Sequence, residues 1–349
     1  MSNGSQKILV TGGAGFIGSS FVRVALAADY QVIILDALTY AGHIENLEEV
    51  LKPGLCDFEK GSITNLEFVS SVLKKHQPDY FVNFAAESHV DNSISGPKAF
   101  METNILGTFS CLEACRAYYN SLTSDKKNSF KYIQISTDEV FGSLNDTGKF
   151  NESSAYQPNS PYSSSKASGD HLARAWFHTY KLPTIITNCS NNYGPRQYPE
   201  KLIPLMIQNA LIEKTLPVYG TGKNIRDWIH VDDHTRGVLL ALQKGKPGST
   251  YCFGGNSEMT NLEVVNSICS YLDEIKPRKS GQKYSELITF VDDRAGHDWR
   301  YAIDDSLAQK ELDFKRQFES FNMGLKSTCK WYLENKIWSE KIQSKMRST

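Results

Sequence analysis

The stretch Gly12-Gly13-Ala14-Gly15-Phe16-Ile17-Gly18 decides the fold, because it connects a strand to a helix. Residues 7–11 before it form a short β-branched run, and residues 16–28 place apolar side chains at helical spacing. A second apolar run, residues 31–35, is followed directly by Asp36. Strand, glycine turn, helix and strand in this order predict a βαβ unit with two parallel strands.

The glycine turn also predicts a nucleotide site. Gly12 permits the tight turn, Gly15 lets the backbone approach a pyrophosphate, and Gly18 allows close packing of helix and strand. The unpaired N–H groups at the start of the helix favour an anion. Asp36 is placed to accept hydrogen bonds from ribose hydroxyls and would repel a 2′-phosphate, and no arginine follows it directly. We therefore expect NAD rather than NADP, the alternative being a glycine turn without a ligand.

Strands and helices continue to alternate beyond this unit. Helical periodicity near residues 66–76 and 98–119 alternates with apolar strands at 80–85 and 132–136. Strands that are almost wholly apolar are typical of a parallel sheet covered on both faces. The predicted fold class is therefore α/β, a doubly wound parallel Rossmann sheet with a smaller α/β substrate domain. The polar segment 335–349 is expected to form a solvated helix end or a frayed tail.

Composition excludes several classes of protein. The chain has 349 residues, of which 40% are hydrophobic and 22% charged, and its formal net charge is -1. This apolar fraction excludes disorder, and the near-zero charge argues against a protein that coats nucleic acid or an anionic membrane. The seven cysteines lack a metal-ligand pattern and predict buried thiols, no metal site and a reducing cytoplasm. The sequence shows no signal-peptide pattern and no membrane-spanning run.

Tyr162 and Lys166 form the second chemical signal. Residues four apart share one face of a helix, so the phenol and the ammonium group can lie together. A nearby cation lowers the pKa of a phenol, which would make Tyr162 a base for a sugar or alcohol hydroxyl. A tyrosine and a lysine at this spacing, taken alone, more often lie on a solvated face of a helix without a catalytic role.

Two adjacent acids follow the strand expected at 132–136. Thr137, Asp138 and Glu139 lie where the carboxyl end of a parallel strand would face a bound cofactor. One carboxylate could remove a proton from one carbon while the other, held neutral, protonates a hydroxyl that leaves from the next. The pair favours a dehydratase over an epimerase, although acids at a strand end are commonly only solvated or capping groups.

These motifs resemble a known family. The glycine turn followed by Tyr162 and Lys166 resembles the extended branch of the short-chain dehydrogenase/reductase superfamily. With further segments that match in order from about Lys7 to Trp338, the chain resembles the nucleoside-diphosphate-sugar 4,6-dehydratases. The further segments are Phe84 to Asp91, Ser136 to Gly142, Asn188 to Pro195, Pro199 to Pro204, Arg226 to Trp228 and Asp293 to Asp298.

The resemblance implies a reaction with a role for each catalytic residue. Tyr162 takes the proton of the sugar C4 hydroxyl as hydride passes from C4 to NAD. Thr137 hydrogen-bonds the C4 oxygen, and Lys166 holds the nicotinamide ribose and lowers the pKa of the tyrosine. Glu139 then removes the C5 proton, Asp138 protonates the C6 hydroxyl that leaves as water, and hydride returns to C6. On dTDP-glucose this reaction gives dTDP-4-keto-6-deoxyglucose.

The other residues implied by the resemblance bind cofactor and substrate. The cofactor set is Gly12, Gly15, Phe16, Ile17, Gly18, Asp36, Ser62, Ile63, Ala85, Ala86, Tyr162 and Lys166. The substrate set is Ser88, His89, Asn191, Lys201, Arg226, Ser257, Arg294 and His297, in which the two arginines are expected to clamp the diphosphate. Ser62 and Ser257 stand where the family often has Asp and Asn, which leaves the nucleotide and the sugar open.

Alternatives remain for the substrate and for the function. UDP-glucose, CDP-glucose or UDP-N-acetylglucosamine could replace dTDP-glucose, and a C4 epimerase, a decarboxylase or a cofactor-binding regulatory protein without turnover are alternative functions. The resemblance also implies a homodimer packed through the helices near 98–119 and 162–180, with no nucleic acid and no membrane as partner. The expected cofactor domain spans residues 1–190, with 226–254 and about 305–325 returning to it, and the nucleotide-sugar domain spans 191–225, 255–304 and about 326–349.

Overall fold

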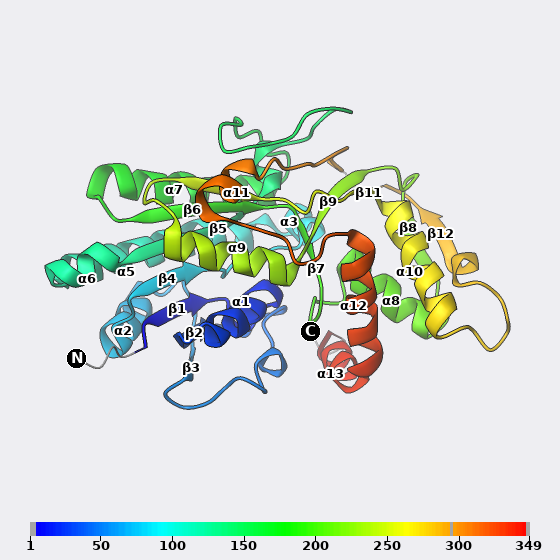
Figure 1. Cartoon of the computed structure of the whole chain (residues 1–349), viewed down its shortest axis with the longest axis horizontal. Helices are drawn as coiled ribbons and strands as arrows, with labels where there is room; N and C mark the ends of the chain where they lie inside the picture. Colours follow the sequence, from blue (N-terminus) through cyan, green and yellow to red (C-terminus); the bar gives the residue numbers. More distant parts are fainter. Residues whose placement is uncertain (1–4, 294–295, 347–349) are drawn as a thin grey trace.

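A computed structural model describes residues 5–293 and 296–346 and places a seven-stranded parallel sheet at the centre of the molecule (Figure 1). Its strands are β1 (Lys7–Thr11), β2 (Gln31–Asp36), β3 (Cys56–Lys60), β4 (Tyr80–Asn83), β5 (Lys131–Thr137), β6 (Thr184–Cys189) and β10 (Thr250–Phe253). The strand order is β10-β6-β5-β4-β1-β2-β3, so the chain starts inside the sheet and extends it in both directions. This order confirms the predicted doubly wound α/β fold.

Alternate residues of each strand pack on opposite faces of the sheet. Ile8 and Val10 of β1 join the apolar cluster that contains Phe21, whereas Leu9 joins the cluster that contains Val69. Both faces are therefore buried, as the nearly continuous apolar strands predict. Helices α1 (Phe16–Ala27), α9 (Val231–Lys244) and α11 (Ser306–Leu312) cover the first face, and α2 (Leu66–His76), α5 (Thr108–Ser121) and α7 (Pro161–Tyr180) cover the second (Figure 1).

The helix expected near 98–119 is interrupted by a wider turn. It consists of α4 (Pro97–Phe100), the π-helical segment η2 (Met101–Gly107) and then α5. Buried Asn104 on η2 accepts a hydrogen bond from the Glu87 N–H at 2.9 Å and donates to Ser165 Oγ at 2.8 Å. The wider turn therefore ties the loop after β4 to helix α7, close to the predicted catalytic tyrosine.

A second apolar core lies beside the central sheet, at the right of Figure 1. The chain enters it after β6 and rejoins the central sheet through α9 and β10. Residues 226–230, which the expected division assigns to the returning segment, pair within a small three-stranded sheet as part of β9. The chain packs on the central sheet again from α9 onward, and the domain division stays a prediction. The elements around this core are β7 (Asn191–Tyr193), β8 (Leu216–Tyr219), β9 (Ile225–His230), β11 (Glu258–Thr260), β12 (Ile288–Val291), α8 (Leu202–Leu211), α10 (Asn261–Ile275), α12 (Phe321–Glu334) and α13 (Lys336–Met346).

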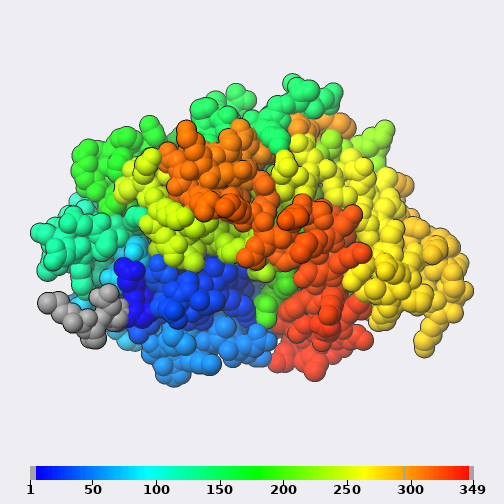
Figure 2. Space-filling model, viewed as in Figure 1, coloured from blue at the N-terminus to red at the C-terminus, as the bar shows by residue number. Residues whose placement is uncertain are grey.

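The polar end of the chain packs on the molecule, so the expectation of a solvated tail is wrong. Ile342 of α13 is fully buried, and Trp338 Nε1 donates to Asn46 Oδ1 at 2.9 Å. Figure 2 shows the C-terminal helices in red against blue residues of the N-terminal third. Two apolar residues one turn apart meet the second core, a contact that the polar composition of the segment conceals. The remaining short helices are η1 (Ile44–Asn46), α3 (Val90–Ser95), α6 (Ser124–Ser129), η3 (Asp138–Phe141) and η4 (Tyr284–Leu287).

Candidate active site

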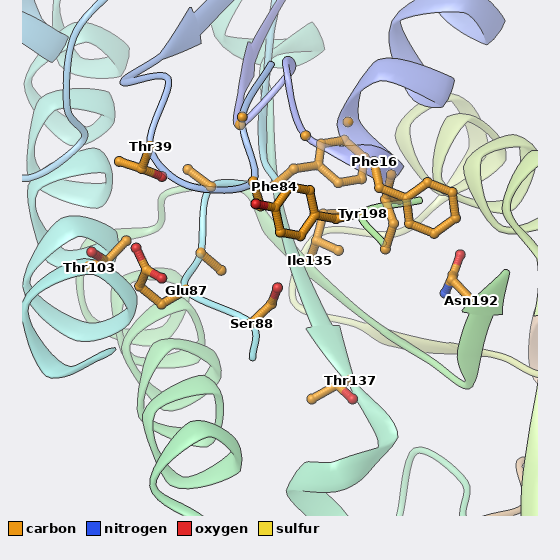
Figure 3. Close-up of a pocket in the computed structure, with 18 of the residues that line it drawn as sticks. Phe16, Thr39, Phe84, Glu87, Ser88, Thr103, Ile135, Thr137, Asn192 and Tyr198 are labelled. Atoms are coloured by element: carbon orange, nitrogen blue, oxygen red, sulfur yellow. The ribbon is translucent and has the colours of Figure 1, made fainter. Parts of the chain in front are cut away.

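A deep cavity opens along the carboxyl ends of the central strands and encloses about 1600 Å³ of space, the open solvent at its mouth included. Figure 3 shows Thr39, Glu87 and Thr103 toward one end of it, Asn192 toward the other, and Thr137 at the end of β5. Every residue predicted to bind the cofactor or to act in catalysis lines this cavity. The predicted residues in its lining are Gly12, Gly15, Phe16, Ile17, Gly18, Asp36, Ser62, Ile63, Ala85, Ala86, Ser88, Thr137, Asp138, Glu139, Tyr162, Lys166, Asn191 and Lys201.

The glycine turn has the shape that a bound diphosphate requires. A Cβ at Gly12 would stand 2.6 Å from the Ala85 nitrogen, and one at Gly18 would stand 2.2 Å from the Gly12 carbonyl oxygen. Only hydrogen fits at either position. Gly15 is the N-cap of α1 and lines the cavity, and no side chain caps the first N–H groups of the helix. The residues present therefore fit the diphosphate of NAD, held by backbone donors at a helix N-terminus.

Asp36 shapes the turn in addition to lining the cavity. Its carboxylate accepts from the Ala14 N–H at 2.9 Å and from the Leu38 N–H at 2.8 Å. Burial raises the pKa of Asp36, while the two backbone donors act in the opposite direction. The side chain predicted to receive ribose hydroxyls thus also fixes the glycine turn to the end of β2.

Asp138 is a buried carboxyl group beside a second acid. Burial raises its pKa well above the ordinary range, and the neighbouring Glu139 and the carboxylate of Asp227 raise it further. Thr137 Oγ1 donates to Asp138 Oδ1 at 3.2 Å and accepts from the Glu139 N–H at 3.3 Å. Burial and the neighbouring carboxylates therefore favour the neutral form of Asp138 at the end of β5, which is the form that a proton donor needs.

Tyr162 and Lys166 both line the cavity, but the net shift in the pKa of the phenol is upward, whereas the sequence predicts a lowered value. Burial raises the pKa of Tyr162 well above its ordinary value, and Glu139 raises it further. Lys166 Nζ donates to the Ile135 carbonyl oxygen at 2.6 Å, and burial lowers its pKa. The helical spacing places the two groups on one face, yet desolvation inside the cavity outweighs the cation.

Lys201 joins two of the predicted substrate segments. Lys201 Nζ donates to the Ser88 carbonyl oxygen at 2.9 Å, although the two residues are 113 positions apart. Glu200 also lines the cavity, with its carboxylate 3.7 Å from His89 Nε2 and 4.0 Å from Lys201 Nζ. Burial raises the pKa of Glu200 to about 7, against the lowering effect of Lys201.

Some predicted substrate residues lie outside the lining of the cavity, namely His89, Arg226, Ser257 and His297. Buried Arg226 donates to the carbonyl oxygens of Ile225 at 2.7 Å and Asp298 at 2.9 Å, and its guanidinium lies 4.3 Å from the centre of the Tyr301 ring. Arg294 lies outside the described residues. The substrate roles of all of these residues stay predictions.

Several residues of the lining were not predicted from the sequence. Glu87 lies inside one of the segments that carry the family resemblance and could have been found there. Thr39, Tyr40 and Tyr198 come from loops, and the rings of the two tyrosines meet edge to face at 5.7 Å. Thr103 comes from the π-helical segment η2. No local pattern marks these four residues, because the folded chain alone brings their segments to the cavity.

Known nucleotide-sugar dehydratases are similar to this chain along nearly its whole length. A family model described as GDP-mannose 4,6 dehydratase matches residues 9–328. A probable dTDP-glucose 4,6-dehydratase of Sinorhizobium fredii is 51% identical over 343 residues, 98% of this chain and 97% of the relative. The dTDP-glucose 4,6-dehydratase 1 of Escherichia coli is 51% identical over 349 residues, 97% of this chain and 96% of the relative.

A solved structure is also similar to this chain over nearly its whole length. The dTDP-glucose 4,6-dehydratase of Streptomyces venezuelae, crystallised with NAD and dTDP bound, superposes with a TM-score of 0.87 at 43% sequence identity. The match covers 97% of this chain and 100% of that one.

Proposed function

The chain belongs to the GDP-mannose 4,6-dehydratase family, and on that premise we propose that it removes water from dTDP-glucose to give dTDP-4-keto-6-deoxyglucose. The observation that carries this proposal is the buried Asp138, whose Oδ2 has no hydrogen-bond partner among the described residues, beside Glu139 in the cavity that Tyr162 also lines. An enzyme that only oxidises and reduces C4 needs no second acid, whereas loss of water needs a proton donor for the leaving hydroxyl. The reaction requires NAD, which fits the glycine turn.

The first step is oxidation at C4. Tyr162 takes the proton of the C4 hydroxyl, and Thr137 donates a hydrogen bond to the same oxygen. Burial raises the pKa of Tyr162, so the phenolate needs a positive charge nearby, which Lys166 on the same face of α7 would supply. Lys166 holds the nicotinamide ribose with the donors that remain beside its bond to Ile135. Bound NAD supplies the redox chemistry, accepting hydride from C4 and giving it back at C6.

The second step is loss of water between C5 and C6. The C4 ketone acidifies the C5 hydrogen, and Glu139 removes it as a proton. Asp138 gives its proton to the C6 hydroxyl, so the C6–O bond breaks and water leaves. Glu139 returns its proton to C5 as C6 is reduced, so the reaction as a whole loses one water without net oxidation. Two acids with opposite protonation states are what this sequence of transfers requires.

We assign the diphosphate and the base to the part of the cavity near Lys201. Lys201 lines the cavity and already contacts Ser88. Asn191, on β7, lines the same cavity. Arg226, Arg294 and His297 are proposed to complete the anion site, because guanidinium groups match the paired oxygens of phosphates. His89 and Ser257 remain proposed contacts of the sugar or the nucleotide.

Turnover of defined nucleotide sugars tests the function. Purified protein is incubated with dTDP-glucose, UDP-glucose, CDP-glucose or UDP-N-acetylglucosamine, and mass spectrometry follows the loss of one water. We expect dTDP-glucose to be dehydrated with the highest kcat/KM. In D₂O the product should carry deuterium at C5, because a proton held on Glu139 exchanges with solvent. If none of the four is dehydrated in the presence of NAD, the proposed function fails.

We infer that two chains pair through the outer face of α5 and α7, the helices that the sequence predicts for a homodimer. Phe109, Trp176 and Tyr180 form a continuous aromatic patch there, with ring centres 5.9 and 5.4 Å apart, and Leu106 lies exposed one turn before Phe109. Exposed apolar patches of this kind mark interaction surfaces.

The predicted compartment is a reducing cytoplasm. All seven cysteines are buried and unpaired thiols, which suits a location where disulfides do not form. Within residues 5–293 and 296–346, no helix has the length and apolarity needed to cross a membrane.

A further inference from the structure

Asp170 is a buried carboxyl group that the proposed reaction does not use. It lies one helical turn beyond Lys166 on α7, so Tyr162, Lys166 and Asp170 succeed one another at four-residue spacing on one helix face. Only 1% of its surface is exposed, and it does not line the cavity. Any effect that it has on the reaction must therefore pass through a neighbouring residue.

The hydrogen bonds of Asp170 reach the strand that carries the catalytic acids. Its Oδ2 accepts from Ser136 Oγ at 2.5 Å and from Tyr156 OH at 3.0 Å. Ser136 directly precedes Thr137 at the end of β5, and Tyr156 belongs to the loop between β5 and α7. Its Oδ1 is buried without a hydrogen-bond partner among the described residues. A carboxylate buried in this way is costly unless a cation lies near.

Lys166 is that cation. Its ammonium group is buried, and Ile135 provides its hydrogen-bond acceptor at 2.6 Å. Burial lowers the pKa of Lys166, and Asp170 is the strongest influence in the opposite direction, ahead of the Cys189 thiol on β6. Burial in turn raises the pKa of Asp170 to about 6, and Lys166 acts to lower it. The other titratable groups that face the pair are Tyr132, Tyr156 and Tyr162.

We propose that Asp170 is a positioning residue, whose carboxylate keeps Lys166 charged and holds the end of β5 in register with α7. Lys166 needs its charge to hold the nicotinamide ribose and to stabilise the phenolate of Tyr162. Only the measurement of turnover rests on the proposed function, because the electrostatic coupling of Lys166 and Asp170 exists with or without a substrate.

The first test is the pH dependence of Asp170→Asn, which keeps the shape of the side chain and removes its charge. Without the carboxylate, the charged form of Lys166 is disfavoured, so its pKa falls. Two unit charges about 6 Å apart at an effective dielectric of about 20 shift a pKa by about one to two units. The alkaline decline of kcat and of NAD affinity should move to lower pH by that amount. Unchanged profiles for both quantities would overturn the proposal.

The matched control is Tyr156→Phe. This variant removes one hydrogen bond of Asp170 and keeps its charge, and Tyr156 does not line the cavity. We expect its alkaline decline to stay at the wild-type pH. If Tyr156→Phe and Asp170→Asn shift the profile equally, Asp170 acts through packing alone and the electrostatic role is wrong.

A double-mutant cycle on the full chain tests the pair without substrate. Lys166→Met leaves Asp170 as an unpaired buried charge, so Asp170→Asn should destabilise the wild type much more than it destabilises Lys166→Met. We expect a coupling of at least about tenfold in the unfolding equilibrium constant, measured by urea unfolding. If Asp170→Asn alone does not fold, Lys166→Met in the same chain should restore folding. Additive effects, or no restoration, would refute the coupling.

Discussion

Replacing Gly18 by Ala tests whether backbone contacts, and not only a ligand, require the glycine turn. The new Cβ would stand 2.2 Å from the Gly12 carbonyl oxygen and 2.9 Å from the Gly13 Cα. Both are backbone atoms, which cannot swing away as a side chain can. Ordinary contact begins at 3.4 Å, so the start of α1 would have to retreat from the turn by about 1.2 Å.

The net effect follows from two opposing contributions. Alanine is favoured over glycine inside a helix by about 1 kcal/mol. Overpacking of a rigid site costs about 1–3 kcal/mol, and backbone neighbours place this site at the upper end. We expect Gly18→Ala to lower the free energy of unfolding by about 2 kcal/mol and to weaken NAD binding, because the N–H groups of α1 retreat from the turn.

Gly15→Ala is the matched control on the same turn. Its Cβ would meet only the Gly12 carbonyl oxygen, at 3.3 Å, and Gly15 has ordinary extended backbone angles. We expect it to lose only about 1 kcal/mol of stability, because alanine is a poorer N-cap residue than glycine. Its NAD affinity should fall about ten- to hundredfold, because the methyl group occupies the approach of the diphosphate to the turn.

Urea unfolding of both variants without NAD, and calorimetric titration with NAD, separate the two effects. In the absence of cofactor Gly18→Ala should lose about twice as much stability as Gly15→Ala, and Gly15→Ala should be affected mainly in its affinity for NAD. A Gly18→Ala protein that is as stable as the wild type would refute the argument that the turn is shaped by contact with α1.

Four further variants have expected outcomes. Glu139→Gln should stop loss of water and still permit oxidation at C4, so NADH absorbance should rise with no dehydrated product; full activity would remove Glu139 from the mechanism. Asp138→Asn should lower kcat by a factor of about 10² to 10⁴. Because burial raises the pKa of Asp138 in the folded state, the folded protein binds more protons than the unfolded chain and loses stability as pH rises above the usual pKa of an aspartate. Asp138→Asn should make this loss smaller between pH 5 and 8, measured by urea unfolding, while Asp170 and Glu200 still contribute to it. Trp338→Ala should lower the free energy of unfolding by about 3–5 kcal/mol in urea, and a smaller loss would mean that α13 contributes little. Leu106→Asp should yield monomers by light scattering while the wild type forms dimers, and persistence of the dimer would exclude this face.

Local patterns in the sequence were sufficient to predict many of the residues that line the cavity. The glycine spacing depends on sterics within one turn, and the spacing of Tyr162 and Lys166 depends on the pitch of one helix. Parallel strands bring their carboxyl ends to one edge, so the positions of Asp36 and of the Asp138-Glu139 pair followed from the order of strands. All of these residues line one cavity.

The protonation states and the remaining lining were decided by the tertiary structure. Sequence spacing predicted a lowered pKa for Tyr162, but the shift depends on desolvation by segments distant in sequence, and it has the opposite sign. The position of Arg226 also depends on a distant segment, because its guanidinium donates to the carbonyl oxygen of Asp298 as well as to that of Ile225.

The sequence by itself predicted the sheet, the cofactor turn and the residues that we propose to react, because each prediction rests on a local pattern of residues and on the order of the strands. Only the folded chain decided which groups are buried together. Two examples are the burial of Asp170 near Lys166 and the packing of α13 on the second core. Burial sets the charge of a buried acid and the stability of a polar helix, and burial is a property of the whole fold rather than of any segment.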